Sequence, residues 1–168
     1  MVSNIVRICV GVFLIPTMSQ SQKLTEADFR VVDLVVNEKV DTTFLFSKLG
    51  RPKTSEQFID SLRTVSPETS FVYQFDSVSV NIQRFWIRYF EFTTSSWVTH
   101  RGVRVGDTSE KIMKLYGKPS TETYLGYSEN PIEDVISYYI KPNSTLGIAF
   151  YLRNKRVWKI IVGWDTGC

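Results

Sequence analysis

The sequence is poor in the residues that bind metals or form covalent cross-links. It contains one histidine, His100, and two cysteines, Cys9 and Cys168. Structural zinc needs four ligands, mostly cysteine and histidine, so the usual zinc sites cannot be assembled. Cys9 lies in an N-terminal segment that we expect to be removed, which leaves Cys168 without an internal disulfide partner. We therefore predict a chain that is held together by packing and that uses no metal and no cofactor.

Catalytic motifs are also missing from the sequence. It has no Gly-rich phosphate loop, no nucleophile elbow and no Ser/His/Asp order. Asp107 and Glu110 are explained as helix caps, and the neighbouring acids Glu133 and Asp134 lie in an expected loop, where carboxylates are solvated. A lone histidine is usually a surface or hydrogen-bonded residue. We predict that the protein is not an enzyme. A hydrolase of envelope polymers, with His100 as its base, is the less favoured alternative.

The N-terminal apolar run is too short to cross a membrane. It extends from Ile8 to Ile15, whereas a helical span needs ~20 apolar residues. The run follows one positive charge at Arg7, and small residues at Ser19 and Ser21 suit a signal peptidase that cuts before Gln22. This layout predicts a cleaved signal peptide and a periplasmic or secreted protein with no stable membrane anchor.

The net charge is small and aromatic residues are abundant. Loss of Arg7 with the signal peptide lowers the formal net charge from +3 to +2, which is too small to indicate nucleic-acid binding.

The Asn143-Ser144-Thr145 sequon would matter only in a eukaryotic secretory pathway. The chain has 11 Phe, 8 Tyr and 4 Trp, so the division of these rings between core and surface is the main functional question.

Signals for the start and end of a helix occur twice. Asp41 and Asp107 are the expected N-caps, with Glu110 as the capping-box partner of Asp107. Gly50 and Gly117, which are 67 residues apart, are the expected helix ends, and each is followed by a proline two residues later. The repeated pattern predicts two related helices.

The remaining pattern predicts one more helix and a set of strands. Thr54 and Gln57 suit the start of a helix that continues through Leu62, with Phe58 and Ile59 on its buried face. Turn signals at Asp76-Ser77, Pro142-Asn143 and Asn154-Lys155 separate apolar runs that we expect to form antiparallel hairpins. The expected strands are residues 71–75, 78–82, 85–93, 135–141, 146–153 and 157–164.

These elements predict an α+β fold made of two tandem repeats, each with helices packed on one face of an antiparallel sheet. The triplet Arg84-Phe85-Trp86 recurs as Arg156-Val157-Trp158, which supports the duplication. We expect three segments. They are the signal peptide at 1–21, a first repeat at 22–95 and a second repeat at 96–168.

Two short motifs support a family resemblance. Val105-Gly106-Asp107-Thr108 followed by Gly117-Lys118-Pro119 resembles the β-lactamase-inhibitor-like superfamily, which includes small outer-membrane assembly lipoproteins of the SmpA type. The resemblance implies a helix layer on an antiparallel sheet that serves mainly as a binding module. Two tandem copies resemble the inhibitor branch, in which a concave sheet grips a protein partner. The matching positions are structural, so no functional residue is carried over.

The strongest candidate site is an aromatic and basic face on two strands. Strand alternation over residues 83–92 places Arg84, Trp86, Arg88, Phe90 and Phe92 on one side. We expect this side to be exposed, because an unpaired buried charge is costly, and Trp, Tyr and Arg are enriched at interface hot spots. The predicted binding residues are Arg84, Trp86, Arg88, Phe90, Arg156, Trp158 and Trp164. In the alternative interpretation, Trp86 and Trp158 are core residues.

The sequence therefore favours an exported, non-enzymatic module that binds another exported or envelope protein. It predicts no nucleic-acid partner. A structural component of cell-envelope assembly is the alternative.

Overall fold

The computed structural model describes residues 23–60, 68–125, 133–141 and 144–164. The predicted signal peptide, the sequon residue Asn143 and Cys168 lie outside these ranges. Two eight-residue helices, one short 3-10 helix and ten strands make up the described fold. In chain order they are η1 (Glu26–Phe29), β1 (Arg30–Val31), β2 (Leu34–Val35), α1 (Thr42–Leu49), β3 (Thr54–Asp60), β4 (Glu68–Gln74), β5 (Ser79–Gln83), β6 (Trp86–Phe92), α2 (Ser109–Tyr116), β7 (Thr121–Leu125), β8 (Glu133–Tyr139), β9 (Leu146–Arg153) and β10 (Arg156–Trp164).

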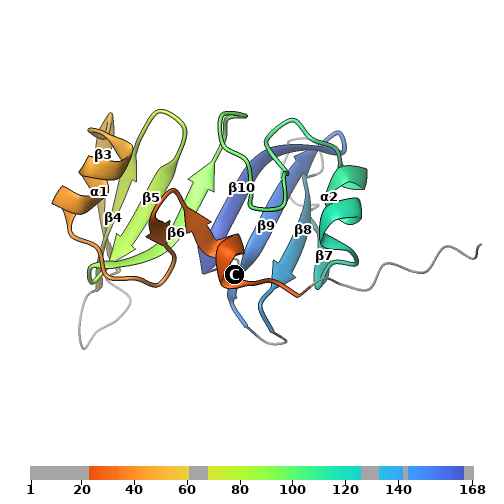
Figure 1. The fold of residues 1–168 in the computed structure, drawn as a ribbon, viewed down its shortest axis with the longest axis horizontal. Coiled ribbons are helices and arrows are strands. Elements are labelled where there is room, and N and C mark those ends of the chain that lie inside the picture. The colour runs from red at the N-terminus through yellow and green to blue at the C-terminus, as the bar shows by residue number, and fades with distance from the viewer. Residues whose placement is uncertain (1–22, 61–67, 126–132, 142–143, 165–168) are drawn as a thin grey trace, which may run out of the picture.

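One antiparallel sheet of eight strands organises the molecule (Figure 1). The strand order is β3-β4-β5-β6-β10-β9-β8-β7, so neighbours in space are neighbours in sequence except at one joint. At that joint, residues Tyr89–Phe92 of β6 pair with Ile160–Gly163 of β10. Both halves of the chain therefore meet in the middle of a single sheet.

The helices, η1, and the small β1–β2 sheet all lie on the same side of the large sheet (Figure 1). The hydrophobic core fills the space between them. Its largest fully buried members are Tyr116, Tyr138, Phe90, Phe92 and Phe150, together with Leu34, Leu45, Ile87, Ile112, Ile148, Leu152 and Ile160. Tyr138 also donates a hydrogen bond of 2.9 Å to the carbonyl of Gly117, which ties β8 to the end of α2. The opposite face of the sheet carries none of the described helices.

The predicted fold class is wrong. The structure is mostly β, with 45% strand and 17% helix, rather than two helix-plus-sheet repeats. The two α-helices are short, and the strands that follow them join into one sheet instead of forming two helix-covered units. The physical reason is that every interior strand edge is satisfied by a neighbour, including the β6–β10 joint, which removes the unpaired edges that separate units would expose.

The helix ends follow the sequence signals closely. Asp41 is the N-cap of α1, and its carboxylate accepts the Phe44 backbone N–H at 2.7 Å, as predicted. Gly50 and Gly117 end the two helices with positive φ angles of 82° and 77°, which also confirms the prediction. For α2 the predicted cap is displaced by one residue, because the N-cap is Thr108.

Asp107 has a different role from the predicted cap. Its carboxylate accepts the Arg104 backbone N–H and the Lys111 ammonium, each at 2.8 Å. It therefore closes the turn that leads into α2 and pairs with a charge in the first turn of the helix. These contacts lower the pKa of the Asp107 carboxyl, although partial burial alone would raise it.

The helix predicted from Thr54 to Leu62 is wrong over Thr54–Asp60, which form a strand, and Leu62 lies outside the described residues. Residues Thr54–Asp60 pair with all seven residues of β4, from Glu68 to Gln74. Thr54 and Gln57 resemble a helix cap locally, but seven consecutive backbone pairings outweigh that preference. The strand β7, which pairs with β8, was not predicted at all.

Candidate functional site

Two β-bulges rearrange the predicted binding face. On β6 the register with β5 shifts between Asn81 and Ile82, so that Ile87 pairs with Ile82 and Tyr89 pairs with Asn81, leaving Arg88 as the extra residue. On β10 the register with β9 shifts between Val157 and Lys159, leaving Trp158 as the extra residue. A bulge changes which side chains share a face, so simple alternation fails beyond it.

The consequence is that Phe90 belongs to the core. It is fully buried, as are Phe92, Ile160 and Val162, which alternation had placed on the same exposed face. Phe92 stacks on Trp97, with ring centroids 3.6 Å apart, in the segment that crosses the helix side of the sheet. Phe90 is therefore removed from the candidate site, and the prediction that it binds a partner is wrong.

The other predicted residues lie in three separate places. Arg84 and Trp86 lie at the β5–β6 turn, where Arg84 pairs with Glu68 at 2.8 Å. Arg88 and Trp164 meet beside the β6–β10 joint, with the guanidinium 4.8 Å from the ring centroid. Arg156 and Trp158 begin β10. Arg156 donates to the Gly106 carbonyl at 3.0 Å, so it anchors the loop before α2.

Trp158 is the centre of a dense aromatic and basic group on the face that no described helix covers. We define the Trp158 cluster as Tyr151, Arg153, Trp158 and Lys159. The Arg153 guanidinium lies 4.1 Å from the Trp158 ring centroid, and the Lys159 ammonium lies 4.2 Å from the Tyr151 ring and 4.9 Å from the Trp158 ring. The two rings meet edge to face with centroids 6.3 Å apart. Each contact is a favourable cation–π or aromatic geometry.

The bulge at Trp158 makes this cluster possible. Val157 and Ile160 enter the core, while Tyr151 and Lys159 pair across β9 and β10 on the opposite face. The extra residue allows Trp158 to join them rather than replace a core side chain. The sequence signal for this arrangement was the run Arg156-Val157-Trp158. Tyr151, Arg153 and Lys159 were missed because only the register between β9 and β10 brings them next to Trp158.

One carboxylate borders the Trp158 cluster. Glu91 on β6 lies 3.9 Å from the Lys159 ammonium, across the β6–β10 joint. Tyr89, two residues before Glu91, faces the same side, and burial raises the pKa of its hydroxyl, with the Glu91 charge adding to the rise. The cluster therefore has Arg153 on one side of Trp158 and the Lys159–Glu91 ion pair on the other.

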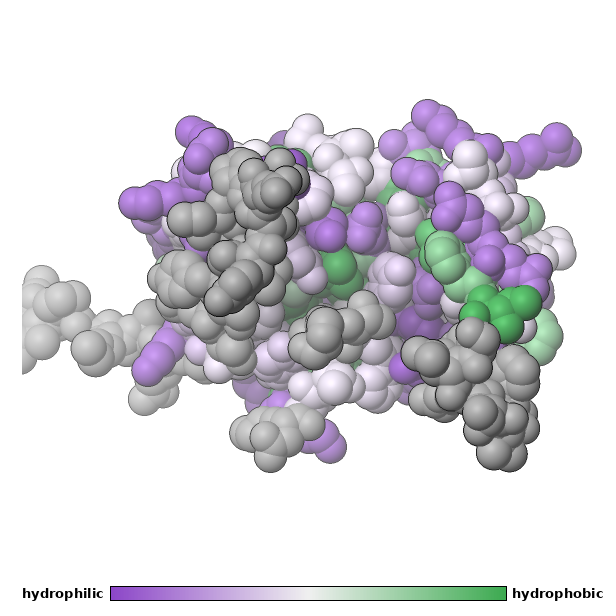
Figure 2. Space-filling view, turned by 180° about the vertical axis from the view of Figure 1, so that it is seen from behind, coloured by the Kyte–Doolittle hydropathy of each residue, from purple (hydrophilic) through white to green (hydrophobic). Residues whose placement is uncertain are grey.

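Small residues form a shallow hollow beside the cluster. It is lined by Ser137, Tyr139, Gly147, Ile148, Ala149, Ile161 and Gly163. Figure 2 shows this side of the molecule, where hydrophobic residues are visible between hydrophilic ones near the middle of the face. Glycine is required at two of these positions, because a Cβ at Gly147 would collide with the Tyr138 carbonyl and one at Gly163 with the Arg88 carbonyl. The hollow is too shallow to hold a side chain, so it extends the surface beside the cluster without forming a pocket.

The β5–β6 turn presents a second, more isolated aromatic pair. Arg84 and Phe85 both have positive φ, at 52° and 69°, a conformation that usually selects Asn and Gly in a two-residue hairpin. Phe85 is 73% exposed and Trp86 is 37% exposed. Trp86 contacts the Lys39 ammonium, 5.6 Å from its ring centroid. The pair belongs to the opposite half of the sheet from Trp158.

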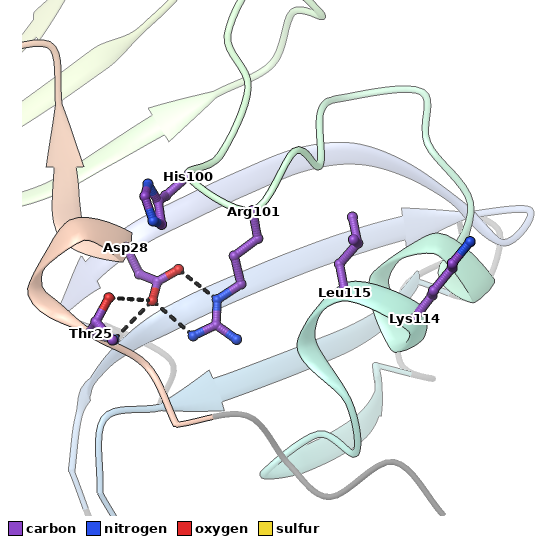
Figure 3. Close-up of a pocket in the computed structure, with 6 residues that line it drawn as sticks. All are labelled: Thr25, Asp28, His100, Arg101, Lys114 and Leu115. Atoms are coloured by element: carbon purple, nitrogen blue, oxygen red, sulfur yellow. Dashed lines mark hydrogen bonds and ion pairs between the residues drawn. The ribbon is translucent and has the colours of Figure 1, made fainter. Parts of the chain in front are cut away.

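The pocket around His100 lies on the helix side of the sheet. It has a volume of about 350 Å³ and is lined by Thr25, Asp28, His100, Arg101, Lys114 and Leu115 (Figure 3). Asp28 is completely buried and accepts the Arg101 guanidinium through both carboxylate oxygens, at 2.9 and 3.0 Å. It also accepts the Thr25 backbone N–H at 2.8 Å. Arg101 in turn lies 4.8 Å from the Tyr116 ring centroid and bonds the Lys23 carbonyl at 2.8 Å.

These contacts give the Asp28–Arg101 pair a structural role. The pair ties η1 to the segment that follows β6, and it is enclosed by Tyr116, a core side chain whose pKa is raised by burial and by the Asp28 charge. His100 is exposed at the pocket rim. Arg101 is fixed by Asp28, the Lys23 carbonyl and the Tyr116 ring, so it cannot move readily toward a substrate. The geometry therefore favours a structural clamp between η1 and the segment after β6 over a catalytic site.

No group of three or more His, Cys, Asp or Glu side chains within the described ranges is placed to hold a metal ion. None of the helices in the described part of the chain is long and apolar enough to span a membrane. No protein-family model, curated protein or solved structure matches the chain.

Proposed function

We propose that the protein is an exported, non-enzymatic module that binds another exported or envelope protein through the open face of its sheet. The contact surface is the Trp158 cluster together with the neighbouring hollow. Of the seven residues predicted from the sequence, only Trp158 belongs to this surface, and Tyr151, Arg153 and Lys159 are added to it. The surface does not include Arg84, Trp86, Arg88, Phe90, Arg156 or Trp164.

The observation that carries the proposal is the packing of Arg153 and Lys159 against Trp158 and Tyr151 on a face that no described helix covers. Trp, Tyr and Arg dominate interface hot spots, because they bury a large area and lose little side-chain entropy. Here the cations already hold the rings in place, which reduces the entropic cost of binding.

The indole N–H of Trp158 is buried and has no acceptor within the described structure. An unsatisfied buried donor costs about 1–3 kcal/mol. Trp158 as a whole is only partly buried, so a partner would contact the exposed part of its ring and not this N–H.

The test compares capture of a partner by matched variants. The protein is immobilised and exposed to an envelope extract of its source organism, and captured proteins are identified by mass spectrometry. We expect one exported protein to be retained by the wild type and by Trp86→Ala, and to be lost with Trp158→Ala and Arg153→Ala. Trp86 is the matched control, because it is also a partly exposed tryptophan beside a cation.

A conservative variant tests the aromatic ring. Trp158→Phe keeps an aromatic surface, so we expect it to bind the captured partner more weakly than the wild type but more tightly than Trp158→Ala. The proposal fails if the folded Trp158→Ala variant captures the same proteins as the wild type, or if Trp86→Ala loses them equally.

A further inference from the structure

The strand β3 forms one edge of the large sheet. It pairs with β4 on one side, and no described strand pairs with its other side. Residues 54–59 are all exposed, and the apolar side chains Phe58 and Ile59 are 50% and 60% exposed. The outer edge therefore offers a row of backbone hydrogen-bonding groups flanked by apolar side chains.

The sequence of β3 has few of the features that usually protect a sheet edge. Proteins block such edges with charged side chains, especially lysine, or with proline, a β-bulge or a very short strand. The segment Thr-Ser-Glu-Gln-Phe-Ile-Asp has no lysine or proline, its charges are Glu56 and Asp60, and its seven pairings with β4 run without a register shift. Phe71 on β4, opposite Gln57, is also 36% exposed, so the apolar surface continues inward from the edge.

The charges on β3 select one way of pairing the strand with itself. Two antiparallel copies centred on Glu56 would place the two Glu56 carboxylates directly opposite each other. Centring on Phe58 would place Glu56 opposite Asp60, which again pairs two acids. Centring on Gln57 places Glu56 opposite Phe58 and Ser55 opposite Ile59, and no two acids meet. Like charges directly opposite each other destabilise a strand pair, so the Gln57 register is favoured.

We propose that two copies of the chain associate edge to edge through β3, antiparallel and in the register centred on Gln57. The arrangement is isologous, because the same residues are used by both copies around a twofold axis. It joins the two eight-stranded sheets into one continuous sheet across the dimer. The outer edge of β3 is then hydrogen-bonded in each copy. The surface differs from the Trp158 cluster, so the inference does not depend on the proposed function.

The experiment measures the mass of the full chain by analytical ultracentrifugation over a concentration series. We expect the wild type to shift from monomer to dimer as its concentration rises. Gln57→Lys and Gln57→Glu each place like charges at the twofold axis, so each variant alone should raise the dimer dissociation constant roughly fivefold, the equivalent of ~1 kcal/mol. An equimolar mixture of the two variants places lysine opposite glutamate and should restore the dimer.

The matched control is Gln74→Lys. Gln74 is an exposed glutamine on β4, opposite Thr54 but away from the free edge, so its substitution should leave the dimer intact. Far-UV circular dichroism confirms that each variant is folded. The proposal is overturned if the wild type stays monomeric throughout, if the Gln57 variants dimerise as well as the wild type, or if mixing them restores nothing.

Discussion

At the scale of single residues, Asp28 and Arg101 form a deeply buried ion pair. The Asp28 side chain has no exposed surface, and Arg101 is 13% exposed. Burying a pair of charges gains little when both are present, but removing one partner leaves the other charge uncompensated. Removing either residue of the pair should therefore destabilise the protein, because the remaining charge would be buried without a counter-ion.

We expect Asp28→Asn to lower the free energy of unfolding by about 3–5 kcal/mol, because Arg101 would remain buried without its counter-ion. Urea denaturation followed by circular dichroism measures the change. Asp76→Asn is the control, since its pair with Lys53 is exposed on both sides, and it should leave stability nearly unchanged. Equal stability of Asp28→Asn and the wild type would show that the clamp is not structural.

The residue scale is also where the predicted site was least accurate. Trp158 and the neighbourhood of Arg156 were identified from composition, because aromatic and basic residues interleave there. Phe90 was placed wrongly because the bulge at Arg88 reverses the face of the residues beyond it. A bulge depends on hydrogen bonds to other strands, and here Ile87 bonds both Asn37 and Glu38 in a distant segment. Local alternation carries no information about that segment.

At the scale of elements, the two helices depend on their caps. Each has only eight residues, which is too short for stability in isolation. Asp41 and Thr108 each satisfy a backbone N–H in the first turn, at 2.7 and 3.4 Å respectively. The helices are then held by packing, with Leu45 buried on α1 and Ile112 and Tyr116 buried on α2.

We expect Asp41→Ala to lower the free energy of unfolding by about 1 kcal/mol, because the Phe44 N–H loses its acceptor. Thr108→Ala should cost less, since its hydrogen bond to Lys111 is longer. Chemical denaturation of both variants gives the ranking. Asp41→Asn is the control that retains a capping oxygen, and a loss as large as that of Asp41→Ala would contradict the capping role.

The Asp107 carboxylate should make stability depend on pH. Its pKa in the folded protein is lowered from 3.8, because the gains from Lys111 and the Arg104 backbone N–H outweigh the effect of burial. A depressed pKa stabilises the folded state above the unfolded-state value, and this contribution disappears as the pH falls through the folded-state value. We expect Asp107→Asn to show a smaller loss of stability on acidification than the wild type, measured by denaturation at a series of acidic pH values. Parallel curves for the two proteins would refute this assignment.

Elements were predicted well where their signals are local and poorly where they depend on pairing. Asp41, Gly50 and Gly117 act within one helical turn, so the sequence alone identified both α-helices. The strand β3 carries helix-like capping residues, and only its seven pairings with β4 make it a strand. Its identity is therefore decided by residues that follow it in the chain.

At the scale of the whole molecule, the joint between β6 and β10 connects the two halves of the sheet. Only four residue pairs form it, from Tyr89 with Gly163 to Phe92 with Ile160. The core crosses this joint, because Phe90, Phe92, Ile160 and Val162 belong to the same cluster as residues of both helices. A continuous core predicts that the molecule unfolds as one cooperative unit.

Gly163 is the residue at which this cooperativity can be tested. Its φ is 144°, and a Cβ there would meet the Arg88 carbonyl and lie 2.6 Å from the Tyr89 Cα, so the partner strand must move. We expect Gly163→Ala to lower the free energy of unfolding by about 2 kcal/mol or more, with tryptophan fluorescence and circular dichroism still reporting one transition. Gly106→Ala is the matched control, because its φ is 95° but its Cβ would meet nothing within 4 Å, so it adds backbone strain alone and should cost less. Two separate transitions in Gly163→Ala would mean that each half folds independently and that the joint, rather than the shared core, couples them.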